Sequence, residues 1–290
     1  MSLNLKEGNL SRFLELNLAM LLVSTSGALG RYIQLAPALT IAARAAIAFV
    51  ILFGYCKIKG VSLEVSKSHI IPIVLSGLFL GGHWVTYFYS LQWSNVAIGM
   101  LSLFTYPILT AFLEPIFLKT QLQRMHLLLG VLVLIGIYYL VPDFSLENSN
   151  TLAVLIGLFS ALLYALRNVI LKKQVSAYNG SSLMAWQMAV IAIVLSPFFW
   201  IEDSSEIVSQ LPWIFTLAIV TTVLGHTLFL MCFKYFSITS ISILSSIQPI
   251  YGIIIGAIFL KEIPTFQTII GGILILAAVV IESLRTQKTA

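Results

Sequence analysis

Long apolar runs recur along the whole chain, and most polar residues fall in the short connections between them. A helix needs about 17–25 apolar residues to cross the roughly 30 Å hydrocarbon core of a bilayer. Runs of this length predict about ten transmembrane helices and an all-α polytopic membrane protein without a soluble domain. The predicted spans are 12–31, 36–56, 70–90, 95–118, 125–141, 151–171, 181–201, 211–233, 238–260 and 265–284.

The composition supports this class. Of 290 residues, 59% are hydrophobic and only 9% are charged, which is more apolar surface than a soluble domain of this length can bury. We therefore expect the lipid bilayer to surround the chain, in a bacterial-type cytoplasmic (inner) membrane. Cys56 and Cys232 are the only cysteines, and we interpret both as small apolar fillers rather than as a disulfide or metal ligands.

Basic residues fall almost entirely on one set of connections. Short loops rich in Lys and Arg stay in the cytoplasm, so we expect both termini to be cytoplasmic. The net charge of +5 then reports topology, and nucleic-acid binding is excluded because the bases are scattered over the inner loops. The inner bases are Lys6, Arg12, Lys57, Lys59, Lys67, Lys119, Arg124, Lys172, Lys173, Lys234, Arg285 and Lys288; the outer bases are Arg31 and Lys261; the outer acids are Asp143, Glu147, Glu202, Asp203 and Glu206.

The two halves of the chain repeat each other. The segment "YPILTAFLEPIFLKTQLQRMHLLLGVLVLIG" (106–136) aligns without gaps with "QPIYGIIIGAIFLKEIPTFQTIIGGILILAA" (248–278), which matches Pro107 with Pro249. We divide the chain into repeats 1–145 and 146–290, each with about five spans. An odd number of spans turns the second repeat upside down, and inverted repeats are common in secondary transporters.

These residues resemble the drug/metabolite transporter superfamily and its EamA-type permeases. The resemblance rests on the repeat, on Arg44 in "APALTIAARAAIAFVIL" and on the closing "QTIIGGILILAAVVI". It implies a ten-helix basket with a central cavity lined by spans 1, 3, 4, 6, 8 and 9, alternating access, and frequently the export of small metabolites such as amino acids. A permease for drugs, nucleobases or a cofactor is the alternative within the family, and a channel is the alternative outside it.

Polar and aromatic residues form stripes at helical spacing on the same spans. On span 3 the stripe is Ser76, His83, Tyr87 and Ser90, with Trp84 on a neighbouring face. We predict a midplane pocket with aromatic walls; the alternative is that these groups join helices by hydrogen bonds. The predicted substrate-binding residues are His83, Tyr87, Trp84, Tyr106, Tyr164, His226, Ser24, Gln248 and Arg44, and further stripe residues are Asn17, Gly27, Ser102, Thr110, Ser160, Asn168, Thr222, Ser245 and Gly252.

Charged residues inside spans need a reason, because a charge in hydrocarbon is costly. Arg44 lies deep in span 2 and either holds a carboxylate or fixes the packing of one half against the other. Glu15 and Glu114 are candidates for a gate or a proton site, or else reach the interface or pair with nearby bases such as Arg12. We expect Arg167 to extend to the inner surface.

Enzyme activity is not indicated, because metalloprotease, Walker and nucleophile-elbow motifs are absent from the sequence. We therefore predict a protein that is not an enzyme and has no cofactor and no metal. Its expected partners are the bilayer and a small-molecule solute, and we expect it to be a monomer.

Overall fold

The computed structural model describes residues 7–118, 123–141, 143–171, 174–201, 204–232 and 245–289, and within these ranges the regular secondary structure is entirely helical. Its helices are α1 (Glu7–Tyr32), α2 (Pro37–Ile58), α3 (Lys67–Trp93), α4 (Val96–Leu103), α5 (Tyr106–Leu118), α6 (Arg124–Leu140), α7 (Ser149–Leu171), α8 (Gln174–Ala177), α9 (Gly180–Leu195), the 3₁₀ helix η1 (Ser196–Trp200), α10 (Ser204–Thr216), the π-helix η2 (Leu217–His226), α11 (Thr227–Cys232), α13 (Gln248–Phe259) and α14 (Phe266–Thr289).

Seven helical segments of the described chain are long and apolar enough to cross a membrane. They are Ser11–Tyr32, Pro37–Ile58, Lys67–Trp93, Val96–Phe117, Ser149–Leu171, Gly180–Trp200 and Glu206–Cys232; shorter apolar helices are Arg124–Leu140, Gln248–Phe259 and Phe266–Glu282. The predicted class of a helical, polytopic membrane protein is therefore supported, while the count of ten spans stays a prediction. Part of span 238–260 lies outside the described residues, as do Lys6, Lys119, Lys172, Lys173, Lys234, Glu202 and Asp203 and the side chains of Arg285 and Lys288.

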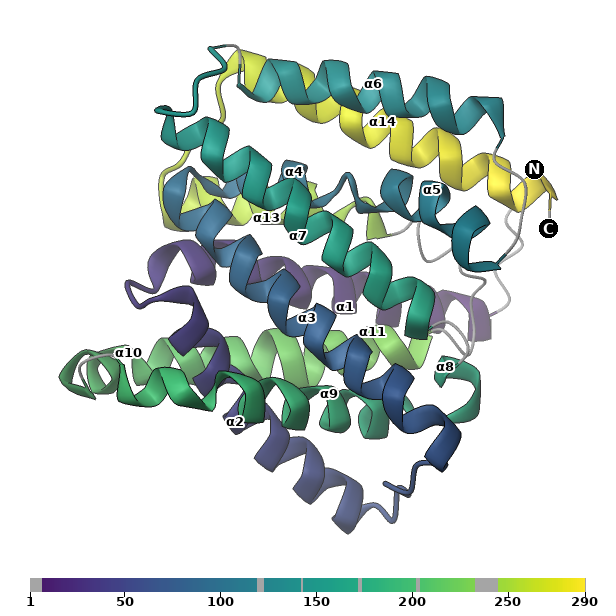
Figure 1. Ribbon diagram of the computed structural model, residues 1–290, viewed down its shortest axis with the longest axis vertical. Helices are drawn as coiled ribbons and strands as arrows, with labels where there is room; N and C mark the ends of the chain where they lie inside the picture. Colours follow the sequence, from purple (N-terminus) through teal and green to yellow (C-terminus); the bar gives the residue numbers. More distant parts are fainter. Residues whose placement is uncertain are drawn as a thin grey trace.

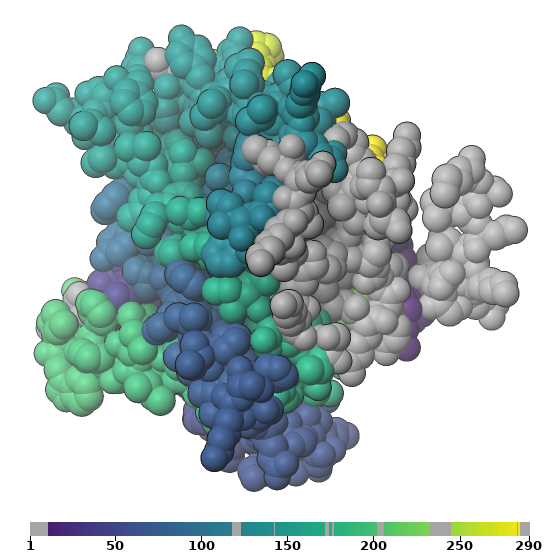
Figure 2. Space-filling view, turned by 45° about the vertical axis from the view of Figure 1, so that its right-hand side comes forward, coloured from purple at the N-terminus to yellow at the C-terminus, as the bar shows by residue number. Residues whose placement is uncertain are grey.

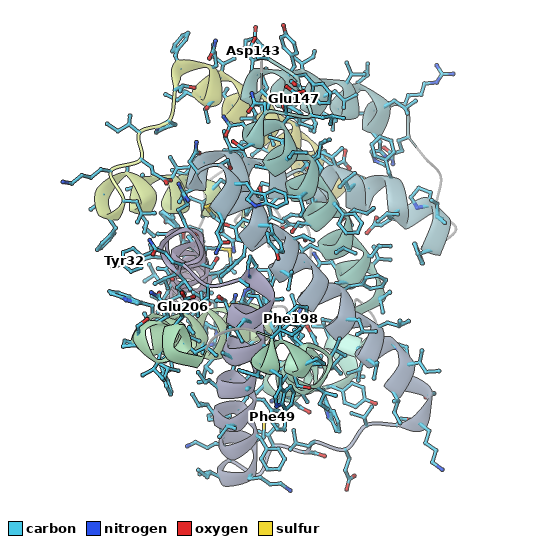
Figure 3. All side chains as sticks on the ribbon, turned by 60° about the vertical axis from the view of Figure 1, so that its left-hand side comes forward. Tyr32, Phe49, Asp143, Glu147, Phe198 and Glu206 are labelled. Atoms are coloured by element: carbon cyan, nitrogen blue, oxygen red, sulfur yellow. The ribbon has the colours of Figure 1, made fainter. Side chains whose placement is uncertain are left out.

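The helices pack in layers (Figure 1). Helices α6 and α14 lie side by side at the top of this view, α3 lies alongside α7 in the middle, α1 packs on α13, and α2 packs on α9 at the bottom. The edge with the α6–α7 and α9–α10 connections lies opposite the edge at which α14 ends (Figure 1). Figure 3 turns the first of these edges forward and shows Asp143, Glu147 and Glu206 on it.

Helices α6 and α14 approach closely because glycines face each other. A Cβ atom on Gly271 would lie 2.6 Å from the carbonyl oxygen of Gly136. Small residues allow such backbone contact between membrane helices. Large apolar side chains such as Leu134 and Ile273 point outward from the same pair and are 65% and 62% exposed, as expected of a surface that meets lipid. Figure 2 shows the side of the bundle where α3, α5 and α7 reach the surface.

The fourth predicted span is two half-helices. The side chain of Asn95 caps α4 by accepting a hydrogen bond from the Ile98 amide (2.9 Å). The helix ends at Leu103, and after a turn at residues 104–105 α5 begins at Tyr106, one residue before Pro107. Proline is favoured in the first turn of a helix because it has no amide hydrogen to leave unpaired.

The second half of the chain has a turn at the matching place. Residues 246–247 form a turn, and α13 begins at Gln248, one residue before Pro249. These positions align with 104–107 in the sequence repeat. Proline-interrupted apolar segments at corresponding positions of two halves are the best sequence pointer to a transporter's binding site.

Candidate functional site

Arg44 lies at the centre of the bundle and is 0% exposed. The buried alanines Ala43 and Ala45 beside it keep α2 close to its neighbours, so the long side chain stays inside the protein. Its Nε atom donates to Thr222 Oγ1 (2.7 Å) and its Nη2 atom donates to Thr221 Oγ1 (2.8 Å). Arg44 therefore links the first half of the chain to η2 in the second half.

The π-helix η2 supplies this hydroxyl pair and also His226. A π-helix has i→i+5 hydrogen bonds and is often found at functional sites. Here the altered winding places Thr221 and Thr222, two consecutive residues, against the same guanidinium group. A sequence motif for this winding is not evident, so the sequence predicted His226 and Thr222 but not the geometry that presents them.

Trp84 covers one face of the guanidinium group. The Cζ atom of Arg44 lies 3.7 Å from the centroid of the Trp84 ring, and a desolvated cation over an aromatic face is stabilised by about 2 kcal/mol or more. The Trp84 ring lies 5.4 Å from the ring of His226. Trp84, expected on a neighbouring face of α3, thus contacts a fully buried charge.

A second set of rings surrounds His83. The His83 ring lies 4.6 Å from Tyr164 of α7 and stacks on Tyr87 at 6.0 Å. Ser160 ties His83 to α7, because its hydroxyl lies 2.7 Å from His83 Nδ1 and donates to the His83 carbonyl oxygen (2.8 Å). The structure thus brings together Arg44, His83, Trp84, Tyr87, Tyr164 and His226, which we call the central cluster.

Arg167 also lies inside the bundle, and the expectation that it extends to the inner surface was wrong. It is 4% exposed, its Nε and Nη2 atoms donate to Gln187 Oε1 (3.3 and 3.0 Å), and its Nη1 atom donates to Asn168 Oδ1 (3.0 Å). Its Cζ atom lies 5.8 Å from the Tyr164 ring. The side-chain amide of Gln187 on α9 reaches this arginine, so Arg167 finds its partner inside the bundle instead of at the membrane surface. The signal in the sequence was Gln187, a buried polar residue in the apolar run "AWQMAV".

Tyr106, the first residue of α5, extends the aromatic set. Its ring lies 4.8 Å from Tyr164, and its hydroxyl lies 3.4 Å from Ser245 Oγ, just before the turn in the second half. The two turns, at residues 104–105 and 246–247, are therefore joined next to the central cluster by the contact between Tyr106 and Ser245.

Ser24 and Gln248 lie elsewhere, at the contact of α1 with α13. The Ser24 hydroxyl lies 2.6 Å from the carbonyl oxygen of Met20 and 3.1 Å from that of Gln248. The side-chain amide of Gln248 contacts Met20 Sδ (3.1 Å). These groups join the two helices, and the structure does not bring them into ring contact with the central cluster.

The two acidic candidates are also outside the central cluster. Glu15 forms an ion pair with Arg12 (2.8 Å) near the start of α1, where both side chains are partly exposed, as the pairing alternative expected. Glu114 is half-buried on α5, about two turns after Tyr106. A gate or proton role for either residue stays a prediction.

Several polar stripe residues join helices, as the alternative interpretation expected. The Ser90 hydroxyl of α3 donates across to the Ala153 carbonyl oxygen of α7 (2.7 Å). Hydrogen bonds of this kind are common between membrane helices. Ser76, by contrast, donates to the Ile73 carbonyl oxygen of its own helix (2.7 Å), so this bond joins no second helix. Spacing identified the buried stripe, but it did not separate these hydroxyls from the groups around Arg44.

A set of polar contacts at the end of α1 also joins the two halves of the chain. Arg31 forms an ion pair with Glu262 (2.9 Å) and donates to the Gln92 carbonyl oxygen (3.1 Å). Glu262 in turn accepts from the Val96 amide at the start of α4 (2.9 Å). We call Arg31, Gln92, Val96 and Glu262 the Arg31 latch, because it fastens the end of α1 and the start of α4 to the connection after α13.

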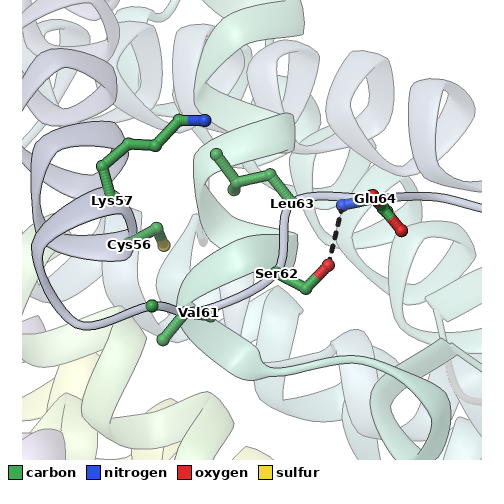
Figure 4. A pocket seen from close by; sticks show the side chains of 7 residues that line it. Cys56, Lys57, Val61, Ser62, Leu63 and Glu64 are labelled. Atoms are coloured by element: carbon green, nitrogen blue, oxygen red, sulfur yellow. Dashed lines mark hydrogen bonds between the residues drawn. The ribbon is translucent and has the colours of Figure 1, made fainter.

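A surface hollow of about 450 Å³ lies at the connection between α2 and α3 (Figure 4). The Glu64 amide donates to Ser62 Oγ there (3.2 Å). The residues that line the hollow are Cys56, Lys57, Gly60, Val61, Ser62, Leu63 and Glu64. None of them belongs to the central cluster. Within the part of the chain that the structure describes, no three His, Cys, Asp or Glu residues gather where they could hold a metal ion.

Known proteins resemble the chain over most of its length. The profile of the EamA-like transporter family matches residues 14–141 and again residues 151–284. The pseudopaline exporter CntI of Pseudomonas aeruginosa is 26% identical over 246 residues, which cover 84% of this chain and 85% of that protein. An uncharacterized transporter of Archaeoglobus fulgidus is 26% identical over 222 residues, which cover 76% of this chain and 77% of that protein.

A solved structure supports the fold. It is described only as the crystal structure of a protein, and it matches with a TM-score of 0.67 and 17% identity over 96% of this chain and 98% of its own. The family and the named relatives are transporters, so the predictions of an integral multi-pass membrane protein and of a protein that is not an enzyme are confirmed. The resemblance to EamA-type drug/metabolite transporters is confirmed as well: the chain belongs to the EamA-like transporter family.

Proposed function

We propose that the protein is a secondary transporter that exports small organic solutes by alternating access, with the central cluster as the binding site. The main support is that Arg44 and the rings around it are buried where the two halves of the chain meet. In carriers the solute binds near the membrane midplane between two halves that rock around it. Export is supported by the relative that is named as an exporter.

The proposal includes two inverted five-helix repeats, 1–145 and 146–290. Support comes from the two successive matches of the family profile and from the turns at residues 104–105 and 246–247, each directly before a helix, which align in the sequence repeat. Together with the positive-inside pattern, this supports a topology in which both termini lie in the cytoplasm of a bacterial-type cell.

Alternating access requires contacts that break when one end opens. The Arg31 latch is such a contact, because it joins α1 and α4 of the first half to the α13–α14 connection of the second half. With this end fastened, a solute at the central cluster would be reached from the opposite end, at which α14 ends (Figure 1).

The function is tested with everted membrane vesicles that contain or lack the protein. The vesicles are incubated with a small-molecule extract, and the accumulated solutes are identified by mass spectrometry. An exporter should concentrate a defined subset of solutes, with a rate that saturates as concentration rises. If vesicles with and without the protein accumulate the same solutes at the same rates, the proposal is wrong.

A further inference from the structure

The guanidinium group of Arg44 has hydrogen-bond donors that the protein does not use. Arginine has five N–H donors. The two threonines occupy Nε and Nη2, whereas the buried Nη1 atom has no partner. A buried donor without an acceptor costs about 1–3 kcal/mol, and more when it is charged. A ligand that supplies an acceptor at this point would therefore be bound favourably.

A second unmet donor lies beside Arg167. Gln187 is 0% exposed, and its Oε1 atom accepts from two nitrogen atoms of that arginine. Its amide nitrogen Nε2 is buried and has no partner. Each of these two nitrogen atoms is a donor, so each lacks an acceptor.

Among the residues that the structure describes, neither of the two buried arginines has an acidic partner. The pairs of basic and acidic side chains there are Arg12–Glu15, Arg31–Glu262 and, where the histidine is protonated, His126–Glu282, and Arg44 and Arg167 belong to none of them. A buried charge without a counter-ion is strongly unfavourable, and in a membrane protein such a charge usually faces its ligand or a partner.

The charge balance also limits what else the solute can contain. An ammonium group at the central cluster would be repelled by two guanidinium groups and would need an acidic side chain to hold it. The face of Trp84, which could hold a cation, is already covered by Arg44. The site is therefore suited to oxygen acceptors and a negative charge.

We propose, building on the transport function above, that the solute is an organic anion whose carboxylate binds the Nη1 side of Arg44. A carboxylate accepts two parallel hydrogen bonds from a guanidinium edge. The threonines use the edge formed by Nε and Nη2. Because each Nη nitrogen carries two hydrogens, the edge formed by Nη1 and the other hydrogen of Nη2 stays open. Tyr164 and His83 contact the rest of the solute, and the amide of Gln187 with Arg167 receives a second acceptor group. Zwitterionic amino acids and cations are disfavoured, which narrows the metabolites expected from the sequence.

The test uses the everted vesicles and measures the charge of what they accumulate. Solutes enriched by the protein should carry a net negative charge and at least one carboxylate. For an enriched solute, its amide keeps the size but loses the charge, and it should compete for uptake at least about tenfold more weakly. Enrichment of zwitterions or cations would overturn this inference and leave the transport function standing, whereas vesicles that accumulate nothing would overturn both.

Variants assign the effect to the arginine. Arg44→Gln should weaken the apparent affinity for the anion by roughly tenfold to a hundredfold, and Arg44→Lys should retain part of it. Arg12→Gln is the matched control, because it removes an arginine from the exposed start of α1, and it should transport normally. Thermal unfolding in detergent reports whether each variant folds. A folded Arg44→Gln protein with unchanged affinity would overturn the inference, and the competition by the amide decides it in the unmodified protein if that variant does not fold.

Discussion

Replacing Arg31 by Gln should release the end of the bundle that the Arg31 latch holds closed. The substitution removes the ion pair with Glu262 and the charged hydrogen bond to the Gln92 carbonyl oxygen. Arg31 and Glu262 have side chains that are 36% and 22% exposed, so the ion pair itself is worth up to about 1 kcal/mol. With the second hydrogen bond, the total is about 1–2 kcal/mol.

Such an energy changes the population of open molecules measurably. One to two kcal/mol corresponds to a factor of about 5–30 in the ratio of closed to open states. The fold should survive, because Glu262 can still accept from the Val96 amide at the start of α4. The expected result is a protein of nearly unchanged thermal stability that opens at this end far more often.

Spin labels at Trp93 and Ile263 measure the opening. Both positions are at the end of the bundle that the Arg31 latch joins, and their side chains are 42% and 84% exposed. The free cysteines Cys56 and Cys232 are buried, and both are first replaced by alanine so that only the introduced cysteines carry a label. Double electron–electron resonance should give one short distance in the parent protein and an added longer distance after Arg31→Gln.

Two further variants decide the interpretation. The exchange Arg31→Glu with Glu262→Arg should restore much of the short distance, because it rebuilds the pair with the charges reversed. Arg12→Gln, which breaks an ion pair near the start of α1, should leave the distances unchanged. An unaltered distance distribution in folded Arg31→Gln protein would refute the role of the latch in alternating access.

Three other predictions follow from the topology, the site and the packing. A cysteine at Ser149 should react with an impermeant reagent added from outside the cell and a cysteine at Ser66 should not; the reverse pattern would invert the orientation. Tyr87→Phe keeps the ring that stacks on His83 and should weaken solute affinity about threefold to tenfold with a melting temperature within a few degrees of the parent, whereas His83→Ala also loses the hydrogen bond between its ring and the Ser160 hydroxyl and should melt earlier. Gly271→Val places a side chain where even a Cβ atom would lie 2.6 Å from the Gly136 carbonyl oxygen, so it should cost about 1–3 kcal/mol and leave the affinity of folded protein unchanged; unchanged unfolding would contradict the close packing of α6 and α14.

The helices and the family could be predicted from the sequence because both depend on patterns that extend over many residues. Apolar run length identifies spans, and the repeated "IFLK" and proline positions identify the family. Helical spacing also identified most of the central cluster, since side chains at such intervals share a face.

Features that depend on how helices meet were not predictable in this way. Arg167 was expected at the surface because it lies near the end of its span, but it donates a hydrogen bond to Gln187 on another helix inside the bundle. The π-helix that carries Thr221 and Thr222 has no sequence signal that we recognise. The break before Tyr106 did have one, because Pro107 and Pro249 each stand in the first turn of a helix, although we interpreted them only as part of the repeat.

Counterflow in proteoliposomes tests the central claim most directly. Purified protein is reconstituted with an enriched solute inside at high concentration, and the same solute is added outside in labelled form at low concentration. An alternating-access carrier should accumulate label above the equilibrium level for a time, and its initial rate should saturate. Label that only equilibrates, at a rate that stays linear with concentration, would contradict alternating access and identify a pore.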